Sequence, residues 1–234
     1  MAEVHLVITP RPLETAADLL AGALRSLPPF PLRASGSGRG PRLGIPGGSA
    51  VAALRLAREV LAPELWSSIL LTWVDERVVP MSDSNSNRGE LLRAGPLGVG
   101  LELPLVLDGE NAEAAAGRTA ERFERDFDGA LDVALLGLGE DGHVASLFPG
   151  HPVLASKGMF AAVNDSPKPP AQRVTLTMPV LARPGVERII VAMGAGKRDA
   201  LRRLIAGDLG IPAALLGAVT VVTDQQLTST KEDP

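Results

Sequence analysis

The sequence contains no cysteine, and only three of its 234 residues are histidines. The absence of cysteine excludes disulfides, thiolate nucleophiles and cysteine-ligated metal sites. The scarcity of histidine limits any imidazole chemistry to His5, His143 or His151.

Long apolar runs and an excess of basic residues are also lacking. No stretch reaches the roughly 18 uninterrupted apolar residues of a membrane-spanning helix, so we expect no membrane association. Met1–Pro10 show neither the basic start nor the apolar centre of a secretory signal, which predicts a cytoplasmic protein. The formal net charge of −4 gives no electrostatic footprint for nucleic acid. A small anionic ligand would therefore have to bind through a local cluster of cations and backbone amides.

The remaining composition, with 45% hydrophobic and 21% charged residues, is that of an ordinary globular protein. Short aliphatic runs alternate with longer Ala/Leu/Arg/Glu-rich segments. We predict strands at His5–Ile8, Arg42–Ile45, Ile69–Val74, Leu131–Gly137, Arg173–Thr177, Arg188–Met193 and Ala218–Thr223. We predict helices at Leu13–Ser26, Ala50–Leu61, Asn87–Leu92, Glu113–Phe127 and Lys197–Ala206. Because most strand runs are continuously apolar and alternate with helices, they predict an α/β protein with a mostly parallel sheet covered by helices.

Two stretches are predicted to be irregular. Ala34–Pro41 is rich in glycine and serine, and the three prolines of Asn164–Pro170 forbid regular structure. Neither stretch divides the chain into halves that could each form a core, so we predict a single domain over residues 1–234. The tail Ser229–Pro234 is predicted to fray. The sequence gives no indication of an oligomeric state.

Ligands of open α/β sheets bind beyond the carboxyl ends of the strands, so the residues after each strand are the candidates for a site. After the second strand come Gly47, Gly48 and Ser49, which open a helix. Glycines and free helix N–H groups suit a phosphate. The alternative is a tight turn in which Ser49 caps the helix, and these three residues alone favour that alternative.

The third predicted strand is followed by Asp75, Glu76 and Arg77. Three charges at the end of a buried strand indicate a polar site, although an exposed ion-pair cluster is the alternative. Further along, Asn87 is a candidate helix cap with Glu90 in the capping-box position.

The run from Gly137 to His143 follows the clearest strand pattern in the chain. It matches the dinucleotide fingerprint G-x-G-x-x-G, and Asp165 lies at a suitable distance beyond it. We reject this interpretation because Glu140 and Asp141 would place two negative charges against a pyrophosphate, and because Pro149 cuts short the helix that should follow.

His143 is instead the candidate catalytic residue. It lies beside Asp141 and Glu140 on a glycine-rich turn, and a carboxylate can fix the tautomer of an imidazole that acts as general base. The sequence leaves open which carboxylate does so. The alternative is a structural histidine in a turn. No second histidine stands at ligand spacing, so we predict no metal site.

Two further cations stand near the same predicted edge. Lys197 lies in the Gly194–Lys197 turn before the last long helix, where the helix dipole opposes a cation unless an anion intervenes. A solvated lysine is the alternative of about equal weight. Arg173 begins the fifth predicted strand.

Taken together, these loops resemble the 6-phosphogluconolactonase family. The resemblance rests on six features in the family's order: Gly47-Gly48-Ser49, Asp75-Glu76-Arg77, Ser86-Asn87, Gly137 to His143 with Ala145 to Gly150, Arg173, and Gly194 to Lys197. It covers residues 47 to 197, and its most specific segment is Gly137 to Gly150. One departure is Ala50-Val51, where relatives often have Thr-Pro.

The resemblance implies a Rossmann-like α/β fold, a mostly parallel sheet with helices on both faces. It implies hydrolysis of a small phosphosugar lactone, 6-phospho-D-glucono-1,5-lactone, to 6-phosphogluconate in the pentose phosphate pathway, with no cofactor and no metal. His143 would be the general base, with Asp141 or Glu140 orienting it. The implied substrate- and phosphate-binding residues are Gly47, Gly48, Ser49, Asp75, Arg77, Asn87, Arg173 and Lys197.

Two other functions remain to be weighed. Glucosamine-6-phosphate deaminases look similar, but a glutamate that assists ring opening stands in them where this chain has Phe148, and Arg77 replaces an aromatic residue. A non-catalytic sugar-phosphate sensor would normally carry a DNA-binding module, and no basic helix-turn-helix segment is visible before Leu13 or after Thr223. The lactonase therefore ranks first.

We predict that the purified protein releases no ammonia from glucosamine 6-phosphate, because Phe148 offers no carboxylate for ring opening. A coupled ammonia assay, run beside a lactone-hydrolysis assay on the same sample, measures both activities. Ammonia release at a rate matching lactone hydrolysis would reverse the ranking.

Overall fold

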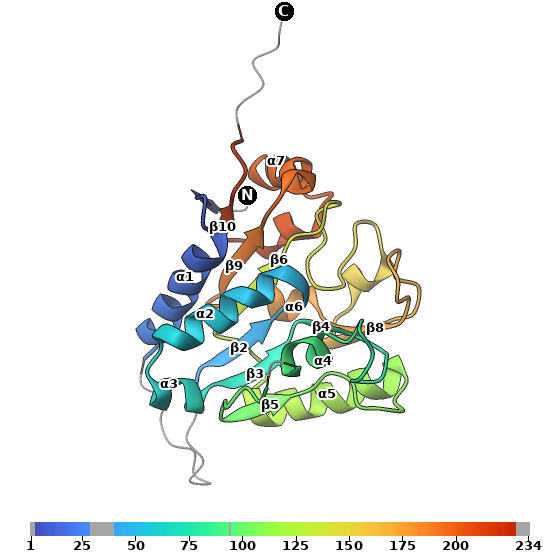
Figure 1. The fold of residues 1–234 in the computed structure, drawn as a ribbon. Coiled ribbons are helices and arrows are strands. Elements are labelled where there is room, and N and C mark those ends of the chain that lie inside the picture. Colours follow the sequence, from blue (N-terminus) through green and yellow to red (C-terminus); the bar gives the residue numbers. More distant parts are fainter. Residues whose placement is uncertain (1–2, 29–39, 94, 228–234) are drawn as a thin grey trace, which may run out of the picture.

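The computed structural model describes residues 3–28, 40–93 and 95–227 (Figure 1). Residues 34–39 of the predicted glycine-rich loop and the predicted frayed tail Ser229–Pro234 lie outside the described residues. The proline-rich stretch Asn164–Pro170 contains no helix or strand, as predicted. In the part of the chain that the structure describes, no helix is long and apolar enough to cross a membrane.

Seven parallel strands form the main sheet, in the order β1-β10-β9-β6-β2-β3-β5. Their bounds are β1 Val4–Ile8, β2 Arg42–Ile45, β3 Leu70–Trp73, β5 Leu101–Leu103, β6 Val133–Gly137, β9 Glu187–Ala192 and β10 Val219–Thr223. The sheet confirms the predicted α/β fold class. Among the strands of this sheet, only β5 was not predicted; it has three residues, of which one is fully buried.

The chain crosses this sheet first in one direction and then in the other, and it forms helices on both passes. On the way from β1 to β5 the chain forms α1 (Pro12–Ser26), α2 (Ala52–Val60), α3 (Pro63–Ser68) and α4 (Asn87–Leu92). On the way back to β10 it forms α5 (Ala112–Phe127), α6 (Met178–Leu181) and α7 (Arg198–Ile205). Because crossovers between parallel strands are right-handed, the two directions place their helices on opposite faces. Figure 1 shows α1 and α2 side by side in front of the sheet.

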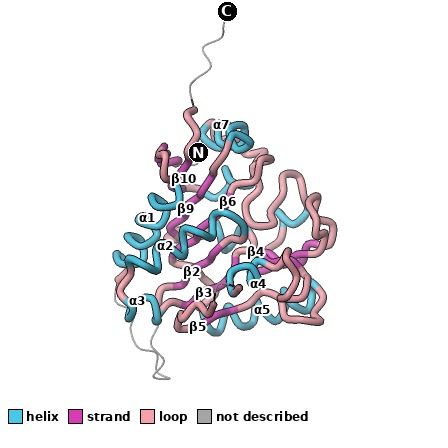
Figure 2. Tube along the Cα trace, viewed as in Figure 1, coloured by secondary structure: helices cyan, strands magenta, loops and turns pink. Residues whose placement is uncertain are grey.

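The change of direction creates a switch point between β2 and β6. These neighbouring strands are hydrogen-bonded, with Leu43 opposite Val133, but the chain leaves them towards opposite faces. Ligands of open α/β sheets bind in the crevice that such a divergence opens at the carboxyl ends of the strands. Figure 2 shows many of the loops gathered on the side of the molecule towards which these strands run.

A second, antiparallel sheet corrects part of the prediction. Asp75–Arg77, expected as a loop, forms β4, and it pairs with β8 (Arg173–Leu176), which pairs with β7 (Phe160–Val163). We expected the β8 segment to lie in the main parallel sheet, because it reads as a continuously buried strand. All four of its residues are indeed buried, but burial does not distinguish a parallel from an antiparallel partner.

Aromatic packing joins α5 to the small sheet. Phe123 stacks on Phe127 with ring centroids 5.0 Å apart and meets Phe160 of β7 edge-on at 5.3 Å. Phe123 and Phe127 are fully buried, and they belong to the same hydrophobic core cluster as the strands of the main sheet. The helix thus fixes the small sheet, which carries part of the site described below.

Truncating Phe123 to alanine should destabilise the protein by about 3–5 kcal/mol, because it leaves a cavity at this junction. Urea unfolding monitored by circular dichroism measures the loss. Leu209→Ala is the control, since Leu209 is 67% exposed and its truncation should change stability by at most about 0.5 kcal/mol. Equal losses in the two variants would contradict the assigned packing.

Candidate active site

A pocket of about 480 Å³ opens at the switch point between β2 and β6. It is lined by loops that follow β2 and β6, by β4 and β8 of the small sheet, and by the turn after β9. Of the residues predicted from the sequence, the pocket wall contains Gly47, Gly48, Ser49, Asp75, Arg77, Asn87, Glu140, His143, Arg173 and Lys197. Asp141 alone is not in the wall.

Asp141 lies next to His143 instead. Its Oδ1 is 2.5 Å from Nδ1 of His143 and also accepts a hydrogen bond from the His143 backbone N–H at 3.3 Å. This contact makes Nδ1 the protonated nitrogen of the neutral imidazole. Nε2 makes no hydrogen bond with any described residue, so the basic nitrogen remains available on a side chain that lines the pocket.

The pKa values of this pair are shifted in the direction that suits a base. Burial lowers the pKa of His143, and the opposing attraction of Asp141 only partly offsets it. Burial by itself would raise the pKa of Asp141, but its hydrogen bond and charge interaction with His143 outweigh that effect and lower it. At neutral pH the pair is therefore a neutral imidazole beside a carboxylate.

Glu140 points elsewhere. A β-carbon placed on Gly196 would lie 2.5 Å from the Glu140 carboxylate, so this side chain lies against the turn that follows β9. The structure places Asp141 and not Glu140 in contact with the imidazole. Glu140 contributes a negative charge to the pocket wall.

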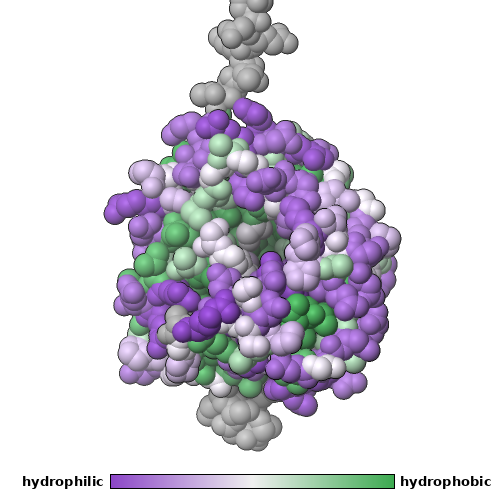
Figure 3. Space-filling model, turned by 45° about the vertical axis from the view of Figure 1, so that its right-hand side comes forward, coloured by the Kyte–Doolittle hydropathy of each residue, from purple (hydrophilic) through white to green (hydrophobic). Residues whose placement is uncertain are grey.

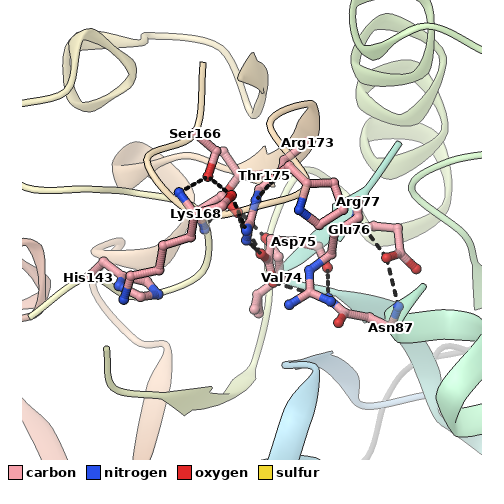
Figure 4. Close-up of polar contacts among 12 residues, drawn as sticks. Val74, Asp75, Glu76, Arg77, Asn87, His143, Ser166, Lys168, Arg173 and Thr175 are labelled. Atoms are coloured by element: carbon pink, nitrogen blue, oxygen red, sulfur yellow. Dashed lines mark hydrogen bonds and ion pairs between the residues drawn. The ribbon is translucent and has the colours of Figure 1, made fainter. Parts of the chain in front are cut away.

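Side chains alternate between the two faces along β4, so its three charged residues do not all point the same way. Asp75 is paired with Thr175 of β8 and Arg77 with Arg173, so the side chains of these four residues share one face of the small sheet. Glu76 faces the other way. This register brings Asp75, Arg77 and Arg173 to the pocket together (Figure 4).

Glu76 organises the start of α4. It is 3% exposed, and its carboxylate accepts hydrogen bonds from the backbone N–H groups of Arg77, Asn87 and Arg88 at 2.7, 2.8 and 2.7 Å. Burial raises its pKa despite these bonds. Two backbone donors at the start of α4 are thus satisfied by a residue from β4, which ties the helix to the strand.

The predicted cap of α4 is wrong by one position. Ser86, not Asn87, is the cap, and its hydroxyl accepts from the Gly89 N–H at 2.9 Å. Asn87 is therefore free to donate from Nδ2 to the Asp75 carbonyl at 2.9 Å. Both residue types cap helices well, so the sequence alone could not separate these neighbours.

Asp75 forms the buried centre of a polar network. Its Oδ2 accepts from the Ser146 hydroxyl at 2.6 Å and lies 3.8 Å from Nη1 of Arg173. Arg173 is 4% exposed, and its Nη2 and Nε donate to the carbonyls of Lys168 and Pro170 at 2.9 and 3.1 Å. Burial lowers the pKa of Arg173, and the attraction of Asp75 opposes this. Much of the guanidinium is therefore engaged within the protein.

The loop after β2 also differs from its prediction. Its first turn is the 3₁₀ helix η1 (Gly48–Val51), capped by Gly47, and α2 begins only at Ala52. Ser49 lies inside η1 and caps nothing. Gly47 has no space for a side chain, because a β-carbon there would overlap the Asn87 carboxamide. This close approach seats the loop against α4.

Two polar atoms beside the pocket are buried without a partner among the described residues. They are Nε of Arg77 and Oδ1 of Asn87. The other end of the Arg77 guanidinium, Nη1, donates to the Asn85 carbonyl at 2.7 Å. Unpaired buried polar atoms cost free energy, which the rest of the fold must offset.

The sequence analysis did not name Lys168 or Ser146 as site residues, and it used Phe148 only to argue against a deaminase. Lys168 lies in the proline-rich loop and reaches the pocket wall, although no local motif distinguishes it from a solvated lysine. Phe148 is 1% exposed and packs between the His143 ring, at 4.8 Å, and the Arg173 guanidinium, at 5.6 Å.

The charge of the wall is opposite to that of the whole chain. Arg77, Lys168, Arg173 and Lys197 face only two carboxylates, Asp75 and Glu140, whereas the chain has a formal charge of −4. Figure 3 shows that polar side chains cover most of one face of the molecule. Local cations, rather than the overall electrostatic field of the chain, thus favour the binding of an anion in this pocket.

Among the described residues, no cluster of three or more His, Asp or Glu is arranged to hold a metal ion.

Comparison with known proteins decides the family. The sequence pattern of the family of glucosamine-6-phosphate isomerases/6-phosphogluconolactonase matches residues 32–224. The chain belongs to this family. A 6-phosphogluconolactonase of Rattus norvegicus is 38% identical over 189 residues, which cover 74% of this chain and 72% of the rat protein. The 6-phosphogluconolactonase of Mycobacterium tuberculosis is 36% identical over 197 residues, covering 74% and 75% of the two chains.

A solved structure agrees with this assignment. The crystal structure of a 6-phosphogluconolactonase from Shewanella baltica superposes with a TM-score of 0.76 at 25% identity, covering 95% of this chain and 97% of that one. The resemblance seen in the sequence is thereby confirmed, and the chain is an enzyme of the lactone-hydrolase branch of the family.

A methyl group at Gly139 should disrupt the site. The β-carbon of Gly139→Ala would overlap His143 Nδ1 and the Asp141 carboxylate, whereas a β-carbon on Gly117 would meet nothing within 4 Å. Because a misplacement of about 1 Å can cost about 100-fold in rate, we expect kcat for lactone hydrolysis to fall by about that factor in Gly139→Ala. Gly117→Ala is the control, because Gly117 is an exposed residue of α5 outside the pocket, and this variant should stay near wild type. A fully active Gly139→Ala enzyme would show that the contact is dispensable.

Proposed function

We propose that this protein hydrolyses 6-phospho-D-glucono-1,5-lactone to 6-phospho-D-gluconate, with His143 as general base. The observation that carries the proposal is the imidazole of His143, held by Asp141 at 2.5 Å, with its second nitrogen unbonded at a cation-rich pocket. The names of the rat and mycobacterial relatives support the same substrate.

The chemistry follows from the neutral state of His143. Its Nε2 takes a proton from a water molecule, whose oxygen bonds to the lactone carbonyl carbon while the π electrons move to the carbonyl oxygen. When the carbonyl re-forms, the bond between that carbon and the ring oxygen breaks, and the imidazolium returns its proton to the ring oxygen. Asp141 stabilises the imidazolium between these two steps. The carboxylic acid so formed loses its proton to solvent.

The phosphate is assigned to Arg77, Lys197 and the backbone amides of Gly47–Ser49. Lys197 has no ion pair with a described residue and caps α7 from the 3₁₀ turn η3 (Ala195–Lys197), where the helix dipole favours an accompanying anion. Arg77 stands directly opposite Arg173, and like charges in this position repel unless an anion or carboxylate lies between them. Arg173 would act on the phosphate through its positive charge rather than through hydrogen bonds, because most of its N–H groups already donate to groups of the protein.

The pocket argues against the deaminase alternative. Phe148 lies against the His143 ring, and it brings no carboxylate to assist ring opening. An apolar ring in this position instead helps to exclude water from one side of the imidazole, and it contributes to the burial that lowers the His143 pKa.

His143→Ala should lower kcat by about 10²–10⁴-fold with little change in KM, because it removes the general base. Asp141→Asn should cause a smaller loss in kcat, since it only orients and stabilises the imidazole. Steady-state assays of 6-phosphogluconolactone hydrolysis, corrected for spontaneous hydrolysis, measure both variants.

The chain provides a matched control. His151 forms a similar pair with Asp165, with Nε2 to Oδ1 at 2.9 Å, but it is not in the pocket wall. His151→Ala should keep near wild-type turnover. If His143→Ala keeps it as well, His143 is structural and the mechanism is wrong.

A further inference from the structure

Lys168 is the pocket cation for which the proposed mechanism has no role. Its Nζ lies 3.7 Å from Oδ1 of Asp141, the same atom that contacts Nδ1 of His143. Figure 4 shows its side chain extending from the proline-rich loop towards His143. The side chain is 43% exposed and lines the pocket, so its ammonium is accessible to a ligand.

The carbonyl oxygen of Lys168 is held by two donors. Its carbonyl accepts from Nη2 of Arg173 at 2.9 Å and from the Ser166 hydroxyl at 2.8 Å. Arg173 also binds the carbonyls of Pro169 and Pro170 at 3.2 and 3.1 Å. The buried guanidinium of Arg173 thus donates hydrogen bonds to three successive carbonyls of one loop. The result is a fixed starting point for the Lys168 side chain beside the catalytic pair.

The ammonium itself is not used by the fold. At 3.7 Å its contact with Asp141 is an ion pair but not a hydrogen bond, and it donates to no described residue. An ion pair this exposed contributes little to stability. All three N–H groups therefore remain available to a group that enters the pocket next to His143.

We propose that Lys168 is a further catalytic residue, whose ammonium stabilises the oxyanion formed at the lactone carbonyl. This inference rests on the proposed hydrolysis, because that oxyanion arises on the carbon attacked by the water that His143 deprotonates. A cation beside the base lies within reach of the same reacting group. A donor that meets the charge mainly in the transition state accelerates the reaction without tightening the binding of substrate.

The same ammonium also acts on the base. The charged groups that face His143 are Asp141 of its own loop, Lys168 of the proline-rich loop and Asp75 of β4. Lys168 lowers the His143 pKa, whereas the two carboxylates raise it. Removing Lys168 should raise this pKa, and the acid limb of the rate profile should move to higher pH because a neutral imidazole is the active form.

The test compares Lys168→Met with Lys197→Met on two substrates, 6-phosphogluconolactone and unphosphorylated glucono-1,5-lactone. Loss of one oxyanion donor costs about 10²–10³-fold in kcat. We expect Lys168→Met to lose rate by about this factor on both substrates, with KM nearly unchanged and the acid limb shifted upwards. Lys197→Met should instead raise KM for the phosphorylated substrate alone. Lys168→Arg, which keeps the charge, should recover much of the loss.

Lys157→Met is the matched control, because Lys157 is exposed and lies outside the pocket. Thermal unfolding of each variant separates a folding defect from a kinetic one. Unchanged kcat in Lys168→Met, or a loss confined to KM for the phosphorylated substrate, overturns the oxyanion role. A wild-type protein that hydrolyses neither lactone overturns the proposed function itself, a result distinct from an active wild type with an equally active Lys168→Met.

Discussion

The pairing of β4 with β8 is the constraint on which the rest of the site depends. It sets Asp75 opposite Thr175 and Arg77 opposite Arg173, so that one carboxylate and two guanidinium groups share a face. Because β4 follows β3 of the main sheet after a single residue, the pairing also joins the two sheets at the edge where the pocket opens. A slip of one residue would turn Glu76 towards the pocket and remove its three backbone hydrogen bonds from the start of α4.

Burial of charge is tolerated here because each group has a partner. Asp75 has the Ser146 hydroxyl and Arg173, while Arg173 has Asp75 and the carbonyls of the proline-rich loop. A buried charge without such partners would cost several kcal/mol. The network therefore serves as a rigid support: Arg173 holds the loop that carries Lys168, and the Asp141 carboxylate holds the ring of His143. The ammonium groups of Lys168 and Lys197 line the pocket beside this support and donate no hydrogen bond to a described residue.

Sequence reasoning located the pocket well and the supporting contacts poorly. Long amphipathic helices have strong local signals, and α1 and α5 were predicted with their observed ends and with starts only one residue late. Short elements such as β4 and β5 have too few residues for a period to show. Lys168 gave no signal, because no local motif distinguishes it from a solvated lysine, and its position depends on how Arg173 folds back onto the carbonyls of its loop. Ser86 and Asn87 were exchanged as caps, because both residue types satisfy free helix amides equally well.

By itself, the sequence determined the fold class, the order of the loops that carry chemistry and the family. These properties depend on hydrophobic periodicity and on residues that are adjacent along the chain, such as Asp141 and His143. Tertiary structure alone decided that β8 pairs with β4 rather than with the main sheet, that Asp141 rather than Glu140 contacts the imidazole, and that Lys168 joins them. Those outcomes depend on the directions of side chains and on partners far apart in the sequence, which local patterns of residue type do not encode.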